Sequence, residues 1–157
     1  MKRFTTIAFI LFFCTLARAQ EPDVVLTMNS YGPIHIGMQV AEARRLLVKL
    51  GRKNLPGTSK VAKEECDHYQ ASNDLSFMVE HGRIVRIETR EQNVVTPSGI
   101  RVGTSLERVR KVFGSRAEDF RQHYSDDEND RTIVLVSGDK RFAIRVEGNQ
   151  TVSEMYV

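Results

Sequence analysis

The sequence predicts an α+β fold made of two tandem repeats, each of which packs one helix on one face of an antiparallel sheet. Three observations lead to this prediction. A short motif recurs at a constant offset, so that residues 32–47 align with residues 98–113 without a gap. Apolar residues at helical spacing follow a glycine in each copy, and segments of alternating apolar and polar residues come after them. Self-similarity on this scale is typical of one supersecondary unit used twice.

The first repeat is expected to span residues 30–92, after a short edge strand near residues 24–28. Its helix has apolar residues at the spacing of one buried face, and Gly51 stands where a left-handed C-terminal cap is expected. A loop rich in Pro, Gly, Ser and Asn follows. A hairpin comes next, with a first strand near residues 75–79, a tight turn at His81-Gly82 and a return strand over residues 83–89.

The second repeat is expected to span residues 96–157, because Thr96-Pro97-Ser98-Gly99 punctuates the boundary. Thr104 and Glu107 have the spacing of a capping box, which predicts the start of the second helix. Gly114 is expected to end that helix. Four strands are then expected near residues 120–125, 132–136, 141–147 and 152–156, and the third shows period-two alternation at Phe142, Ile144 and Val146.

The N-terminus has the pattern of a secretion signal. Lys2 and Arg3 precede an apolar run that is too short to span a bilayer, and Ala17-Arg18-Ala19 is a small-x-small cleavage site. We therefore expect cleavage after Ala19, a single domain over residues 20–157, and a periplasmic or secreted location. Cys14 follows a lipobox-like stretch, so lipidation is the alternative to simple cleavage. No later segment is long and apolar enough to predict a transmembrane helix.

Cleavage changes what the charge implies. The full chain has 23 basic and 20 acidic residues, but the segment 1–19 carries three of the basic residues and no acid. The remaining chain therefore has no net charge, which argues against nucleic acid as a partner. Cleavage also leaves Cys66 as the only cysteine, so an intramolecular disulfide is excluded.

No catalytic or metal-binding motif stands out, so the sequence predicts neither an enzyme nor a bound cofactor. Ser137-Gly138-Asp139-Lys140 fits Ser-x-x-Lys, but Gly-Asp between two strands is an ordinary hairpin turn. The acidic stretch 126–130 lacks the alternation of a calcium loop and is interpreted as a solvated loop. Cys66 and His68 could share a strand face, but the other histidines are scattered, which disfavours zinc.

The candidate binding surface is the sheet face opposite the helices. If the apolar residues of the alternating strands face the core, then Met78 and Arg145 face outward. Tyr69, Arg86 and Tyr124 could join them, depending on the strand register. Tyr, Arg and Met are residue types that protein interfaces favour. The inward-facing set would be Leu75, Phe77, Val79, Phe142, Ile144 and Val146.

The recurring pattern, Gly-x-Ile-x-Ile/Val-Gly followed by a helix, a glycine and antiparallel strands, resembles a group of exported α+β proteins. The group includes the β-lactamase inhibitory proteins, which are tandem repeats, and the small outer-membrane lipoproteins known as SmpA/OmlA, which are single units. The resemblance covers nearly all of residues 20–157 and implies a concave sheet presented to a protein partner. The chain lacks the paired cysteines expected in the inhibitors.

These observations together predict an exported, non-catalytic protein-binding module that uses its open sheet face. An envelope adaptor, an enzyme inhibitor and an immunity-type protein all fit, with another envelope or secreted protein as the partner. The alternative is a protein that binds a small molecule or a cell-wall fragment at the junction of the two repeats, because pockets often form at such junctions.

Overall fold

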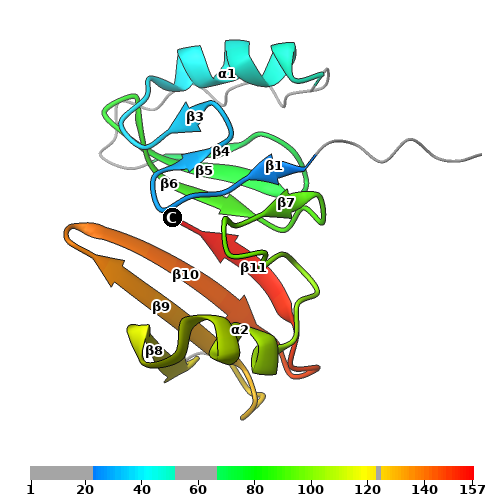
Figure 1. Cartoon of the computed structure of the whole chain (residues 1–157). Coiled ribbons are helices and arrows are strands. Elements are labelled where there is room, and N and C mark those ends of the chain that lie inside the picture. The colour runs from blue at the N-terminus through cyan, green and yellow to red at the C-terminus, as the bar shows by residue number, and fades with distance from the viewer. Residues whose placement is uncertain (1–22, 52–66, 123–124) are drawn as a thin grey trace, which may run out of the picture.

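The protein has a mixed α/β fold with a sheet-rich core (Figure 1). The computed structural model describes residues 23–51, 67–122 and 125–157. The expected signal peptide with Cys14, the thiol of Cys66 and the ring of Tyr124 therefore lie outside the described residues. The two α-helices are α1 (Val40–Lys49) and α2 (Leu106–Phe113), and a short 3-10 turn, η1 (Gly114–Arg116), follows α2.

Seven strands form one antiparallel sheet in the order β4-β5-β6-β11-β10-β9-β8. The strands β8 to β11 occur in reverse order in the sheet, so the last strand, β11, lies in the centre beside β6. Two smaller pairs flank the sheet, and in one of them β1 (Val24–Val25) runs parallel to β7 (Val94–Val95). The other strands are β2 (Ser30–Tyr31), β3 (Ile34–His35), β4 (Asp67–Gln70), β5 (Leu75–Glu80), β6 (Arg83–Thr89), β8 (Ala117–Arg121), β9 (Arg131–Ser137), β10 (Lys140–Val146) and β11 (Val152–Tyr156).

The central pair β6–β11 joins the two parts of the sheet. Thr89 lies opposite Met155, and the backbones of Ile87 and Val157 exchange hydrogen bonds of 2.9 and 3.0 Å. β4 and β5 extend the sheet on the β6 side, while β10, β9 and β8 extend it on the β11 side. The last strand, β11, thus joins the two parts of the sheet. The centre of the sheet is therefore formed by residues that are far apart in the sequence.

Gly37 and Gly103 make the same backbone contacts in the two parts of the chain. Both have φ of +85°, which favours glycine because a Cβ would strain the backbone there. The Gly37 N–H donates to the Ile84 carbonyl at 2.7 Å, and the Gly103 N–H donates to the Val152 carbonyl at 2.8 Å. Each glycine thereby joins the turn before a helix to a strand of the central pair.

The sequence predicts the ends of both helices correctly, but it places the N-cap of α2 one residue too early. The expected capping box at Thr104 is wrong by one residue, because Ser105 is the N-cap and its Oγ accepts from the Arg108 N–H at 3.3 Å. The Thr104 hydroxyl instead accepts from the Arg101 N–H at 3.0 Å, inside the turn that precedes the helix. Gly114 caps α2 at φ 54°, and Gly51 after α1 has φ 85°, as the sequence predicts.

The core lies between the helices and one face of the sheet. The six residues expected to face inward are all buried, with exposures between 0% and 4%. Ala43 and Leu47 of α1 and Val109 of α2 belong to the same apolar cluster, and the rings of Phe113 and Phe142 meet edge to face. In Figure 1, α1 runs along the top near β4–β6, and α2 lies across the lower strands. The alternation therefore predicts the buried face correctly.

Three local features differ from expectation. β8 covers Ala117–Arg121 rather than residues 120–125, because the chain turns directly from η1 into the strand. The lead-in strand is limited to Val24–Val25, and the hairpin of β2 and β3 has no counterpart in the prediction. Within the part of the chain that the structure describes, no helix is both long and apolar enough to traverse a bilayer.

Candidate functional site

The face of the sheet opposite the core is here called the open face. Residues directly opposite one another on neighbouring antiparallel strands point to the same side of the sheet. Met78 of β5 lies opposite Arg86 of β6, and Ser76 lies opposite Glu88. The core residue Phe77 stands between Ser76 and Met78 on β5, so these four residues occupy the other side of the sheet.

The open face continues across the central pair onto β10. Tyr156 of β11 lies opposite Glu88 on one side and Ala143 on the other. Glu154 of β11 lies opposite Arg145 of β10. The centre of the face thus collects side chains from four strands, and charged and aromatic groups predominate among them.

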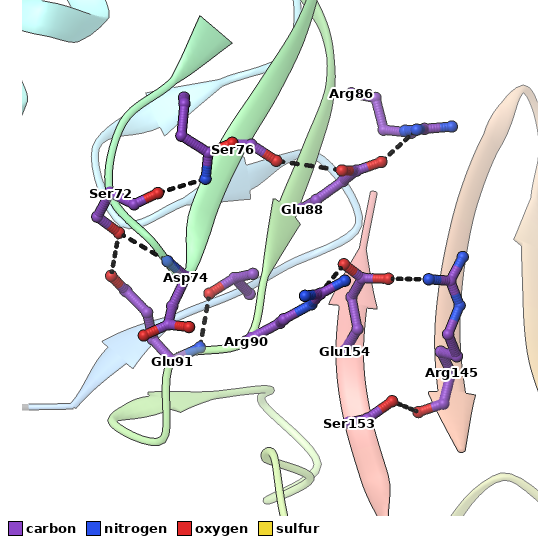
Figure 2. A network of polar contacts seen from close by, with 12 residues as sticks. Ser72, Asp74, Ser76, Arg86, Glu88, Arg90, Glu91, Arg145, Ser153 and Glu154 are labelled. Carbon is purple, nitrogen blue, oxygen red and sulfur yellow. Dashed lines mark hydrogen bonds and ion pairs between the residues drawn. The ribbon is translucent and has the colours of Figure 1, made fainter. Parts of the chain in front are cut away.

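Glu88 is the centre of one polar cluster on this face. Its carboxylate pairs with the Arg86 guanidinium and accepts from the Ser76 hydroxyl at 3.1 Å (Figure 2). The same carboxylate lies 3.4 Å from Nε2 of His68. Burial by itself would raise the pKa of the Glu88 carboxyl, but the Arg86 charge and the hydrogen bonds outweigh burial and lower the pKa below its usual 4.5. Glu88 is therefore ionised and fixes Arg86 in place.

Glu154 is the centre of a second cluster. Arg90 and Arg145 approach its two oxygens from either side, at 3.1 and 2.7 Å (Figure 2). Glu154 is only 6% exposed, so its carboxylate depends on both guanidinium groups for charge compensation. Arg90 directly follows β6 and Arg145 belongs to β10, and the Glu154 carboxylate thereby connects the two sides of the central pair.

The arginines of the open face are ordered by more than these pairs. The guanidinium carbon of Arg86 lies 5.6 Å from the ring centroid of Tyr156, in cation–π geometry. The Nε atoms of Arg86 and Arg145 are buried and have no hydrogen-bond partner among the described residues. Each arginine therefore retains a donor that its carboxylate does not use.

The structure brings together three of the five residues that the sequence suggested. Met78, Arg86 and Arg145 lie on the open face. The suggestion that Tyr69 could share this face is wrong. Tyr69 lies opposite Phe77, stacks on its ring with centroids 5.9 Å apart, and is 7% exposed on the core side. Tyr124, the fifth residue, lies outside the described residues.

Sequence reasoning missed the residues that organise the open face. Glu88 and Glu154 hold the arginines, and Tyr156 lies under one of them. Met155 and Val157 lie two residues apart and are both buried in the apolar core, and this spacing was a usable signal for the face of β11 that turns away from Glu154 and Tyr156. The sequence contained no usable signal for the pairing of β11 with β6, because that pairing joins segments far apart in the sequence.

The residues that the structure describes contain no group of three or more His, Cys, Asp or Glu side chains arranged to hold a metal ion. Ser137 and Lys140 flank a hairpin turn between β9 and β10, in agreement with the structural interpretation of that motif. Asp127 and Asn129 of the acidic stretch form local turn hydrogen bonds.

No family model, no curated protein and no solved structure matches this chain.

Proposed function

We propose that this protein is an exported, non-catalytic module that binds another envelope or secreted protein through its open sheet face. The observation that supports this most directly is the ordering of Arg86 and Arg145. Each is held by a carboxylate, and each retains a buried donor. Fixing long side chains before association reduces the entropy lost on binding, and arginine and tyrosine are frequent interface anchors.

The chemistry of the face favours binding over catalysis. Glu88 and Glu154 are the carboxylates at its centre, and both are paired with arginines. Although burial alone would raise it, the pKa of the Glu88 carboxyl is lowered by the Arg86 charge, which makes Glu88 a weak general base at neutral pH. The arrangement therefore suits recognition of a partner, with Met78 and Tyr156 providing apolar area between the charges.

We also infer that the chain is a duplication, with one helix and its strands in each copy. The matched contacts of Gly37 and Gly103 support this, as do the positions of two register shifts. The β5–β6 pair shifts register after Met78, and the β10–β11 pair shifts after Arg145. Under this correspondence β6 and β11 are equivalent strands that pair with each other about a local two-fold axis.

The test of the binding function compares three forms of the protein in affinity capture from an envelope extract of the producing cell. The variant Met78→Ala/Arg145→Ala removes one apolar and one cationic side chain from the open face. The matched control, Val48→Ala/Arg45→Ala, removes the same two kinds of side chain from exposed positions on α1. Circular dichroism and chemical unfolding establish that all three forms are folded.

We expect one stoichiometric partner to bind the unmodified protein and the α1 control and to be lost from the open-face variant. A partner retained by the folded open-face variant would contradict the use of this face, and capture of nothing by the unmodified protein would contradict the protein-binding function. Export is tested separately, by mass spectrometry of the protein outside the cytoplasm. A chain that begins at Gln20 supports cleavage after Ala19, whereas a cytoplasmic chain that retains residues 1–19 overturns export.

A further inference from the structure

One outer strand of the seven-stranded sheet, β8, has an edge that no described strand covers (Figure 1). Its other edge pairs with β9 from Ala117 to Arg121. An unpaired strand edge presents backbone N–H and C=O groups that can pair with another chain. Proteins often prevent such pairing with charged side chains, and Glu118, Asp119 and Arg121 give β8 three of them. The effect of these charges depends on which side chains a second strand would set against them.

Two residues of β8 direct their backbone groups to the uncovered edge. The Gln122 N–H donates to the Asp130 carbonyl at 3.1 Å, directly after the last register pair of β8 and β9. Hydrogen-bonded and non-hydrogen-bonded pairs alternate along an antiparallel ladder, so the backbone groups of Phe120, like those of Gln122, are directed toward β9. The N–H and C=O groups of Asp119 and Arg121 therefore point away from β9, toward the uncovered edge.

The side chains of Asp119 and Arg121 lie on the core side of the sheet, because Asp119 is opposite the buried Ile133. Arg121 lies opposite Arg131 of β9, where like charges repel each other. Among the described residues, neither of these arginines has a carboxylate within ion-pair distance. Asp119 accepts both hydrogen bonds of Arg110 on Oδ2, at 3.2 and 2.5 Å, so its Oδ1 has no such partner in the described ranges. Arg121 thus lacks a carboxylate, and Asp119 has a free carboxylate oxygen.

Phe120 lies on the other side of β8 and is 49% exposed. It is opposite Thr132, which is opposite Arg145, so its ring belongs to the open face. Two identical strands that pair about a two-fold axis set one residue against its own copy, because facing side chains must share one side of the sheet. Phe120 is the only uncharged residue at positions 118–121. Centring the pair on any other of these residues opposes like charges, whereas centring it on Phe120 opposes two aromatic rings.

We propose that two copies of this chain pair antiparallel through β8, with Phe120 of one copy opposite Phe120 of the other. In this register Asp119 of each copy lies opposite Arg121 of the other, and their free N–H and C=O groups bond to each other. The second copy thereby supplies the carboxylate that Arg121 lacks. The two rings meet at a non-hydrogen-bonded position, where facing side chains are closest. The dimer has one continuous sheet with both open faces on the same side, and this inference does not depend on what the open face binds.

The test measures self-association of the protein, in the form isolated from the producing cell, by sedimentation equilibrium between about 1 and about 200 µM. The interface is little more than one strand from each copy, so we expect a Kd on the order of 10 µM. The variants Arg121→Glu and Asp119→Lys each set like charges against each other across the interface. The matched control is Arg45→Glu, the same change at an exposed position on α1. Circular dichroism establishes that all forms are folded.

We expect each β8 variant to weaken the dimer at least about tenfold, and Arg45→Glu to change its Kd less than about twofold. An equimolar mixture of the two β8 variants should form a mixed dimer, because one variant is anionic and the other cationic at both facing positions. Native mass spectrometry identifies the mixed dimer by its mass, and unfolding of a variant could not produce this rescue. A chain that stays monomeric at about 200 µM, a dimer unchanged in both β8 variants, an equal loss in Arg45→Glu, or a mixture without mixed dimer would each overturn the inference.

Discussion

Met78 of β5 and Arg145 of β10 each stand immediately before a register shift in their strand pair. A register shift of this kind increases the local twist and changes the direction in which side chains are presented. Met78 lies opposite Arg86, and Arg145 lies opposite Glu154, so the shifts frame the charged centre of the open face.

The first prediction concerns Glu154. The Glu154→Ala variant should lower the free energy of unfolding by about 1–3 kcal/mol, because two guanidinium groups lose the carboxylate between them. Arg90→Ala should cost less than about 1 kcal/mol, because the Arg90 side chain is 58% exposed and its pair is screened by solvent. Urea unfolding of both variants measures the difference, and equal costs would contradict the bridging role of Glu154.

The second prediction is a pH dependence that arises from Glu88. Because the pKa of this carboxyl is lower in the folded protein than its usual 4.5, ionisation of Glu88 stabilises the fold above that value. This contribution should be lost as the pH falls through the lowered pKa. The Glu88→Gln variant lacks it, so the difference in unfolding free energy between the two proteins should shrink between pH 6 and pH 3. A constant difference over that range would contradict the prediction.

The third prediction concerns alkaline pH and Tyr69. Burial raises the pKa of the Tyr69 hydroxyl above 10.0, although the charge of Arg44 acts in the opposite direction. The resulting stabilisation is complete below pH 10 and decreases as the pH rises toward the raised pKa, because the unfolded chain ionises first. Tyr69→Phe should remove this alkaline decline.

The same variant provides a check at neutral pH. The Tyr69 hydroxyl has no hydrogen-bond partner among the described residues, so Tyr69→Phe should change stability by less than about 1 kcal/mol at pH 7. Thermal unfolding of both proteins at pH 7, 9 and 10.5 is the measurement. An alkaline decline that persists in the variant would assign that decline to another group.

The fourth prediction concerns the two turns before the helices. Gly37→Ala and Gly103→Ala should each cost about 1–2 kcal/mol, because φ of +85° disfavours a Cβ. No atom lies within 4 Å of a Cβ added at either position, so backbone strain is the only expected cost. Gly37→Asn and Gly103→Asn should cost less, since asparagine tolerates this region better. Clearly unequal costs at the two glycines would argue against equivalent turns.

The sequence by itself determined much of the local structure. Alternation identified the buried faces of β5 and β10, so Met78 and Arg145 could be placed on the open face without the structure. Gly51 and Gly114 marked the ends of the helices because glycine adopts a positive φ at low cost. These features depend on periods and conformations that each segment specifies through its own residues.

The tertiary structure alone decided which segments meet. The pairing of β6 with β11 places Tyr156 beside Arg86 and Glu154 between Arg90 and Arg145, and no local pattern specifies that contact. Tyr69 illustrates the same limit, because a shift of one residue in a short strand exchanges its two faces. The site is therefore a consequence of strand register across the centre of the sheet, whereas its individual strands and turns are consequences of local sequence.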